Sequence, residues 1–96
     1  MLSVGISCAT RAVPDPQFAD CAGDRAAIVS NNGKVQVDVY TTVAGQATPM
    51  AIGTVLPGGR EQLVLPMGAR SVYVRATELR QSGLRRDAIQ IRYICR

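Results

Sequence analysis

Two of the three cysteines stand near the ends of the part of the chain that we expect to fold. Cys21 precedes the first predicted strand, and Cys95 is the penultimate residue, in phase with Ile89 and Ile91 on the expected inward face of the last strand. A disulfide between them would close a loop of about 75 residues, worth roughly 4 kcal/mol on the loop-entropy model. The alternative is two buried thiols, because free cysteine is common in protein cores. Three cysteines without histidine or C-x-x-C spacing match no usual zinc pattern, so we expect no metal site.

The arginines are the second group with usable chemistry, because a guanidinium group binds carboxylates and phosphates bidentately. The chain carries a net charge of +4. If the last two strands form a hairpin centred near Gly83, Arg75 lies opposite Arg92. Facing like charges destabilise a sheet, so either the register differs or an anion or an acid such as Asp38 or Glu78 lies between them. The predicted anion-binding or partner-binding residues are Arg75, Arg80, Arg85, Arg86 and Arg92. The alternative is a solvated arginine rim.

The residue inventory argues against catalysis. The chain has no histidine, which removes Ser-His-Asp and Cys-His arrangements. A Ser-Lys pair would need Lys34, which follows a turn on an exposed strand end where nothing would desolvate it. The seven acidic residues are scattered, and no Gly-Lys-Ser/Thr follows a glycine-rich stretch. We therefore expect no enzymatic activity and no cofactor.

The elements that must position these residues are strands. From Val35 to Val43 apolar and polar residues alternate, which puts the valines on one face of an extended strand. Asn31-Asn32-Gly33 precedes this stretch and predicts a tight hairpin turn, because Asn and Gly tolerate positive φ.

Further short strands follow, separated by Gly- and Pro-containing turns, and no segment has a convincing helical period. The predicted strands are 26–30, 34–43, 50–56, 61–65, 71–77 and 87–95. This pattern predicts an all-β fold, a small antiparallel β-sandwich of about six or seven strands. We expect one domain over residues 21–96, preceded by a flexible, disordered arm over residues 1–20. The arm contains Pro14 and Pro16 and no periodic apolar face, so deletion of residues 1–18 is expected to leave stability unchanged.

Residues 26–75 resemble a type of small bacterial envelope domain. The resemblance rests on turn and core positions: a hydrophobic strand end at Ile28 to Asn31, Val37-Asp38-Val39-Tyr40, Gly53-Thr54-Val55 and Leu65-Pro66. This order is similar to that of immunoglobulin-like β-sandwich domains of uncharacterised secreted proteins and lipoproteins. The resemblance implies a fold and a location in the cell envelope, the periplasm or outside the cell, and it implies no activity.

Residues 1–17 resemble the start of a bacterial lipoprotein. A short apolar lead ends at Cys8, and a Pro-containing tether follows. Gly5 stands where such a lipobox usually has Leu or Val, and no basic n-region precedes it. The resemblance implies lipid attachment at Cys8, which would be the chain's one link to a membrane. The alternative is an unpaired thiol in the arm.

Two function classes remain open from the sequence. The first is a non-catalytic cell-envelope or secreted module that binds another protein or an envelope polymer. The second is a polyanion binder that uses the arginine-rich end, with nucleic acid as one candidate. The few aromatic residues are not interleaved with the basic loop residues, which disfavours nucleic acid. A Cys21–Cys95 disulfide would favour the first class, since disulfides persist in oxidising compartments.

Overall fold

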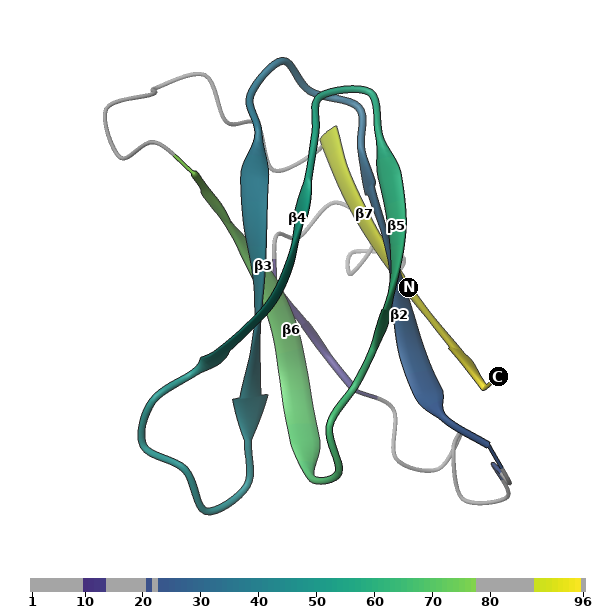
Figure 1. The fold of residues 1–96 in the computed structure, drawn as a ribbon, viewed down its shortest axis with the longest axis vertical. Coiled ribbons are helices and arrows are strands. Elements are labelled where there is room, and N and C mark those ends of the chain that lie inside the picture. Colours follow the sequence, from purple (N-terminus) through teal and green to yellow (C-terminus); the bar gives the residue numbers. More distant parts are fainter. Residues whose placement is uncertain (1–9, 14–20, 22, 78–87, 96) are drawn as a thin grey trace, which may run out of the picture.

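The protein is an antiparallel β-sandwich (Figure 1). The computed structural model describes residues 10–13, 21, 23–77 and 88–95, and these residues form seven strands and no α-helix. The strands are β1 (Thr10–Ala12), β2 (Arg25–Asn31), β3 (Val37–Val43), β4 (Met50–Val55), β5 (Arg60–Val64), β6 (Ala69–Ala76) and β7 (Ile89–Cys95). Sheet A has the order β1-β6-β3-β4, and sheet B has the order β5-β2-β7. None of the described residues forms a helix of the length and apolar character needed to cross a membrane.

The alternating valines build the core as the sequence predicts. Val37 and Val39 of β3 are fully buried, while Asp38 and Tyr40, which alternate with them, are partly exposed. Val72 and Val74 of β6 and Ile89 and Ile91 of β7 bring the inward faces of both sheets into one cluster. The predicted all-β sandwich is therefore confirmed, and each of the six predicted strands overlaps an observed one.

The Asn31-Asn32-Gly33 turn is not the tight hairpin that we predicted. β2 lies in sheet B and β3 in sheet A, so the turn carries the chain from one layer to the other. No described residue other than glycine has positive φ, and Gly33 is not among the glycines that do. The Asn31 side chain shapes this crossover instead, because its Oδ1 accepts a hydrogen bond from the Gly33 amide at 3.0 Å.

Asn31 is fully buried and joins two crossovers. Its Nδ2 donates to the carbonyl oxygens of Val35 at 2.8 Å and Val55 at 3.2 Å. Its main chain exchanges hydrogen bonds with the turn before β5, from the Asn31 amide to Gly59 O and from the Gly58 amide to Asn31 O. The β2–β3 and β4–β5 connections are therefore held together through one side chain and its backbone.

The sandwich closes on the β4–β5 side by direct contact between the two sheets. Leu63 of β5 packs against the backbone of Gly53 in β4, where a Cβ atom would come within 2.7 Å of a Leu63 Cδ atom. Glycine at this position lets a side chain from sheet B cover the edge of sheet A, which explains the Gly in the Gly53-Thr54-Val55 stretch.

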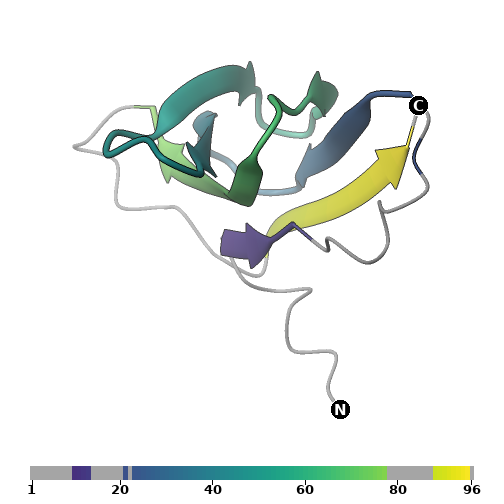
Figure 2. The ribbon, with the colours of Figure 1, turned by 90° about the horizontal axis from the view of Figure 1, so that it is seen from below.

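On the opposite side, residues 10–13 close the sandwich, and this corrects the predicted arm. Strand β1 pairs with β6, and Val13 lies in the core with 7% of its surface exposed. The Arg11 guanidinium donates to the Ile91 carbonyl of β7, and the Tyr93 hydroxyl donates to the Arg11 carbonyl at 2.6 Å. Figure 2 shows β1 in purple beside the yellow strand β7. Residues 10–13 therefore belong to the domain rather than to a flexible arm; residues 1–9 and 14–20 lie outside the described part.

This contact reverses the expected effect of truncation. A chain that begins at residue 14 should be about 2 kcal/mol less stable than one that begins at residue 10, because Val13 burial and the hydrogen bond from the Tyr93 hydroxyl to the Arg11 carbonyl are both lost. Thermal unfolding of the two truncated proteins measures the difference, which corresponds to roughly 8–16 °C for a domain of this size. Equal midpoints would contradict the packing of β1.

The pKa of Tyr93 responds to this buried position. Burial raises its pKa to about 12, while the Arg11 charge and a hydrogen bond with the Val72 backbone act in the opposite direction. The Arg11 guanidinium lies 5.9 Å from the centre of the Tyr93 ring. Because the folded state holds the phenol neutral above its ordinary pKa of about 10, the linked stability is present below pH 10 and is lost between pH 10 and 12.

A tyrosinate absorbance titration checks this assignment. We expect an ionisation near pH 12 in the folded protein that Tyr93→Phe removes. Stability should also fall more steeply from pH 10 to 12 in the parent than in this variant. Both proteins should carry Cys8→Ser, which prevents thiol–disulfide exchange by that thiolate at high pH. If the ionisation near pH 12 is still present in Tyr93→Phe, its assignment to Tyr93 is wrong.

Cys21 and Cys95 form the predicted disulfide, with their Cα atoms 5.7 Å apart and 74 positions apart in sequence. Arg25 at the start of β2 is the cross-strand partner of Cys95 at the end of β7. The bridge therefore joins the residues just before β2, the first strand of sheet B in the sequence, to the end of β7, the last strand of that sheet.

Candidate anion-binding site

The structure separates the arginines that we expected to act together. Arg75 lies in β6 of sheet A, opposite Asp38, and Arg92 lies in β7 of sheet B, opposite Ile28. The predicted hairpin of the last two strands is therefore wrong, because β6 and β7 belong to different sheets. Arg80, Arg85, Arg86 and Glu78 lie outside the described residues, as does Cys8.

Arg75 has an acidic neighbour within its own sheet. Asp38 faces it from β3 and accepts hydrogen bonds from the hydroxyl groups of Thr54, at 3.0 Å, and Thr77, at 2.9 Å. A carboxylate directly across the ladder offsets the charge of Arg75. This part of sheet A is therefore a poor candidate for binding an external anion.

Arg92 instead shares the outer face of sheet B with Arg60. The register places three rows of side chains across β5, β2 and β7 on this face. The rows, in that strand order, are Val64–Ala26–Ile94, Gln62–Ile28–Arg92 and Arg60–Ser30–Gln90. Arg60 and Arg92 thus flank β2 from opposite sides, one row apart.

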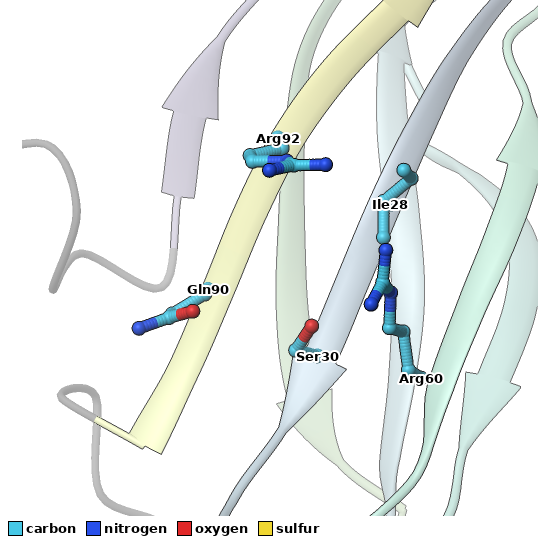
Figure 3. A pocket seen from close by; sticks show the side chains of 5 residues that line it. All are labelled: Ile28, Ser30, Arg60, Gln90 and Arg92. Atoms are coloured by element: carbon cyan, nitrogen blue, oxygen red, sulfur yellow. The ribbon is translucent and has the colours of Figure 1, made fainter.

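Their side chains surround a shallow recess of about 120 Å³ lined by Ile28, Ser30, Arg60, Gln90 and Arg92. Figure 3 shows the Arg60 and Arg92 side chains both directed towards Ile28, with Ser30 on the strand between them. Although Ile28 points to the outer face, only 9% of its surface is exposed. Arginine stems commonly cover apolar surface while the charged groups stay in water, and that arrangement fits this recess.

The lining of the recess favours a negative ligand. The described residues of the lining supply two guanidinium groups, one hydroxyl and one amide, and no carboxylate. Two flanking strands are separated by about 10 Å, since neighbouring strands lie ~4.8 Å apart. Long arginine side chains from both can therefore reach one small anionic group placed over β2. The volume suits a single carboxylate or phosphate group rather than a whole sugar or nucleotide.

A larger cavity of about 390 Å³ is less suited to this chemistry. It lies beside the disulfide and is lined by Cys21, Gly23, Asp24, Arg25, Leu65 and Met67. It places the carboxyl group of Asp24 beside Arg25, so its lining carries both signs of charge. Across the described residues, no group of three or more His, Cys, Asp or Glu side chains gathers in a way that could hold a metal ion.

Sequence reasoning found Arg92 but missed Arg60. Arg60 stands in the Pro57-Gly58-Gly59-Arg60 stretch, which we interpreted as a turn, whereas it is the first residue of β5. Its closeness to Arg92 depends on β5 and β7 both pairing with β2, and no local pattern in the sequence specifies that strand order. The alternation of β5 and β7 could still have placed both arginines on outward faces.

Comparison of the chain with protein-family models, curated proteins and solved structures finds no match.

Proposed function

We propose that this protein is a non-catalytic interaction module of the cell envelope or the extracellular space, which binds an anionic group of its partner in the arginine recess on sheet B. The observation that carries the proposal is the convergence of Arg60 and Arg92 over Ile28, with no acidic residue among the described residues that line the recess. A protein or an envelope component is the expected partner. Lipid attachment through Cys8 remains part of the proposal as the way in which the module would be held at a membrane.

Two further features support a binding role in an oxidising compartment. The Cys21–Cys95 disulfide is the kind of bond that persists outside the reducing cytosol. The chain contains no histidine, and its acidic residues in the described part, Asp24, Asp38 and Glu61, lie on different strands or segments. Intact-mass measurement of protein expressed with its native leader, with and without reductant, would report the disulfide and any lipid on Cys8 together.

The recess is tested by anion titration of isotope-labelled protein. Phosphate and acetate should shift the amide resonances of Ile28 and Ser30, with millimolar affinity that weakens as salt rises from ~20 to 200 mM. The double variant Arg60→Gln, Arg92→Gln should reduce this binding at least about five-fold, because two charge-assisted hydrogen-bond donors are lost. Glutamine keeps part of each stem over Ile28 and so limits the effect on stability.

Arg70→Gln is the matched control. Arg70 is exposed on β6 in sheet A, so this variant loses a charge but leaves the recess intact. It should bind both anions as the parent does. If phosphate and acetate produce no saturable shifts at the recess, or if Arg70→Gln weakens binding as much as the double variant, the recess is not an anion site.

A further inference from the structure

The outer face of sheet B has a second part next to the recess. The row Val64–Ala26–Ile94 is entirely apolar and adjoins the row that contains Ile28 and Arg92. Val64 has 46% of its surface exposed, Ile94 is partly exposed, and Ala26 between them is fully buried. An apolar row that is exposed at Val64 and partly exposed at Ile94 thus borders a pair of guanidinium groups on the same face of sheet B.

The spacing of the two parts matches an extended peptide. Outward residues two positions apart on a strand are separated by about 6.6–6.8 Å, and this is the distance from the apolar row to the row of Arg92. In an extended peptide, side chains at positions i and i+2 point the same way with the same separation. An acidic side chain over Ile28 would therefore place a second side chain, two residues away, over Val64 and Ile94.

We propose that this face binds an extended segment of a partner protein in which a glutamate or aspartate is separated by one residue from a large apolar side chain. The inference rests on the proposed function, since it uses the same recess for the carboxylate. Arg60 and Arg92 bind the acidic group, and Val64 with Ile94 covers the apolar group.

A protein segment fits both parts of the surface better than a nucleic acid or a polyanionic glycan does. A phosphate polymer or a charged glycan would pair with the arginines but would offer little to bury against Val64 and Ile94. Base stacking would need aromatic side chains beside the recess, and none of the described residues that line it is aromatic. The stacked pair Tyr40–Tyr73, with ring centres 5.4 Å apart, lies on sheet A.

A register scan with synthetic peptides tests the inference. Each eight-residue peptide has one fixed glutamate in a background of serine and glycine, and a single leucine is placed one, two or three residues from it on either side. Binding is followed at ~20 mM salt through the methyl resonances of Val64 and Ile94 and the amides of Ile28 and Ser30. The peptide with leucine two residues from the glutamate should bind about five-fold more tightly than the peptide with leucine one residue away. In the second peptide the leucine side chain points to the opposite side of the extended chain from the glutamate.

Two sets of variants separate the parts of the surface. Replacing the glutamate of the best-binding peptide by glutamine should lower its affinity about ten-fold. The protein variant Arg60→Gln, Arg92→Gln should lower the affinity for the original peptide by about the same factor. Val64→Ser should abolish the preference for leucine at two residues and keep the dependence on glutamate. Val64 lies half-exposed on the edge strand β5, so this variant should fold, and its denaturant midpoint should be measured to confirm it. Arg70→Gln should bind every peptide as the parent does.

The outcomes distinguish this inference from the proposed function. Phosphate and acetate binding with no dependence on leucine position would overturn the peptide inference and leave the anion recess standing. Binding of heparin or single-stranded nucleic acid with much greater affinity than any peptide would identify a polyanion as the ligand and also overturn it. If neither anions nor peptides bind, both proposals fail.

Discussion

Replacing Asn31 with alanine is expected to lower the free energy of unfolding by about 4 kcal/mol. The side chain is fully buried and forms three hydrogen bonds, two as donor to the Val35 and Val55 carbonyl groups and one as acceptor from the Gly33 amide. Alanine would leave these backbone groups without the partner that Asn31 provides, and an unsatisfied buried polar group costs about 1–3 kcal/mol. The loss is a large part of the 5–15 kcal/mol that is typical of a domain.

Denaturant unfolding of the variant and the parent measures this effect. Asn31→Asp should be destabilising too, because a carboxylate cannot donate to Val35 and Val55 and its charge would be buried. Asn32→Ala is the control. The side chain of Asn32, next to Asn31 in the sequence, is exposed and should contribute less than about 0.5 kcal/mol to the free energy of unfolding. A loss below about 1 kcal/mol in Asn31→Ala would mean that the crossovers do not depend on this side chain.

Removal of the Cys21–Cys95 disulfide is the second large effect that we expect. Replacing both cysteines by serine should lower the free energy of unfolding by roughly 4 kcal/mol, because a bridge across 74 positions restricts the unfolded chain. A protein of 96 residues with a small core depends strongly on such a constraint.

The comparison should be made in a Cys8→Ser background, so that no remaining thiol can form a different disulfide. The denaturant midpoint of the double serine variant is compared with that of the oxidised parent, and the fully reduced parent should fall close to the variant. A reduced protein that is as stable as the oxidised one would show that the disulfide adds nothing to the folded state.

The strands were predictable from the sequence because their signal is local. The alternation that buries Val37 and Val39 and exposes Asp38 and Tyr40 is set by the two-residue period of any extended chain. The disulfide was also predictable, since Cys21 and Cys95 stand just before the first long strand and at the end of the last.

The order of the strands was not predictable in the same way, because pairing depends on contacts far apart in the chain. Asn31-Asn32-Gly33 has the composition of a hairpin, yet the buried Asn31 amide group binds carbonyl groups of the crossover and of β4 instead. Strand β1 has three residues and no periodicity, and its place depends on the edge of β6 and on Tyr93. Arg60 and Arg92 come together only through that strand order.

The disulfide also determines how the domain would respond to mechanical force. Tension applied before residue 10 and at the end of β7 would reach Cys21 and pass directly to Cys95 through the covalent bridge. After β1 has come away from β6, strands β2 to β7, which lie within the loop closed by the two cysteines, would bear no load until that bridge is reduced. Strand β1 precedes Cys21 and is held by hydrogen bonds and by packing of the adjacent Val13, so it would be the one strand that tension pulls away first. Its removal would free the edge of β6 and open the core at the place of Val13, while the rest of the sandwich stays folded.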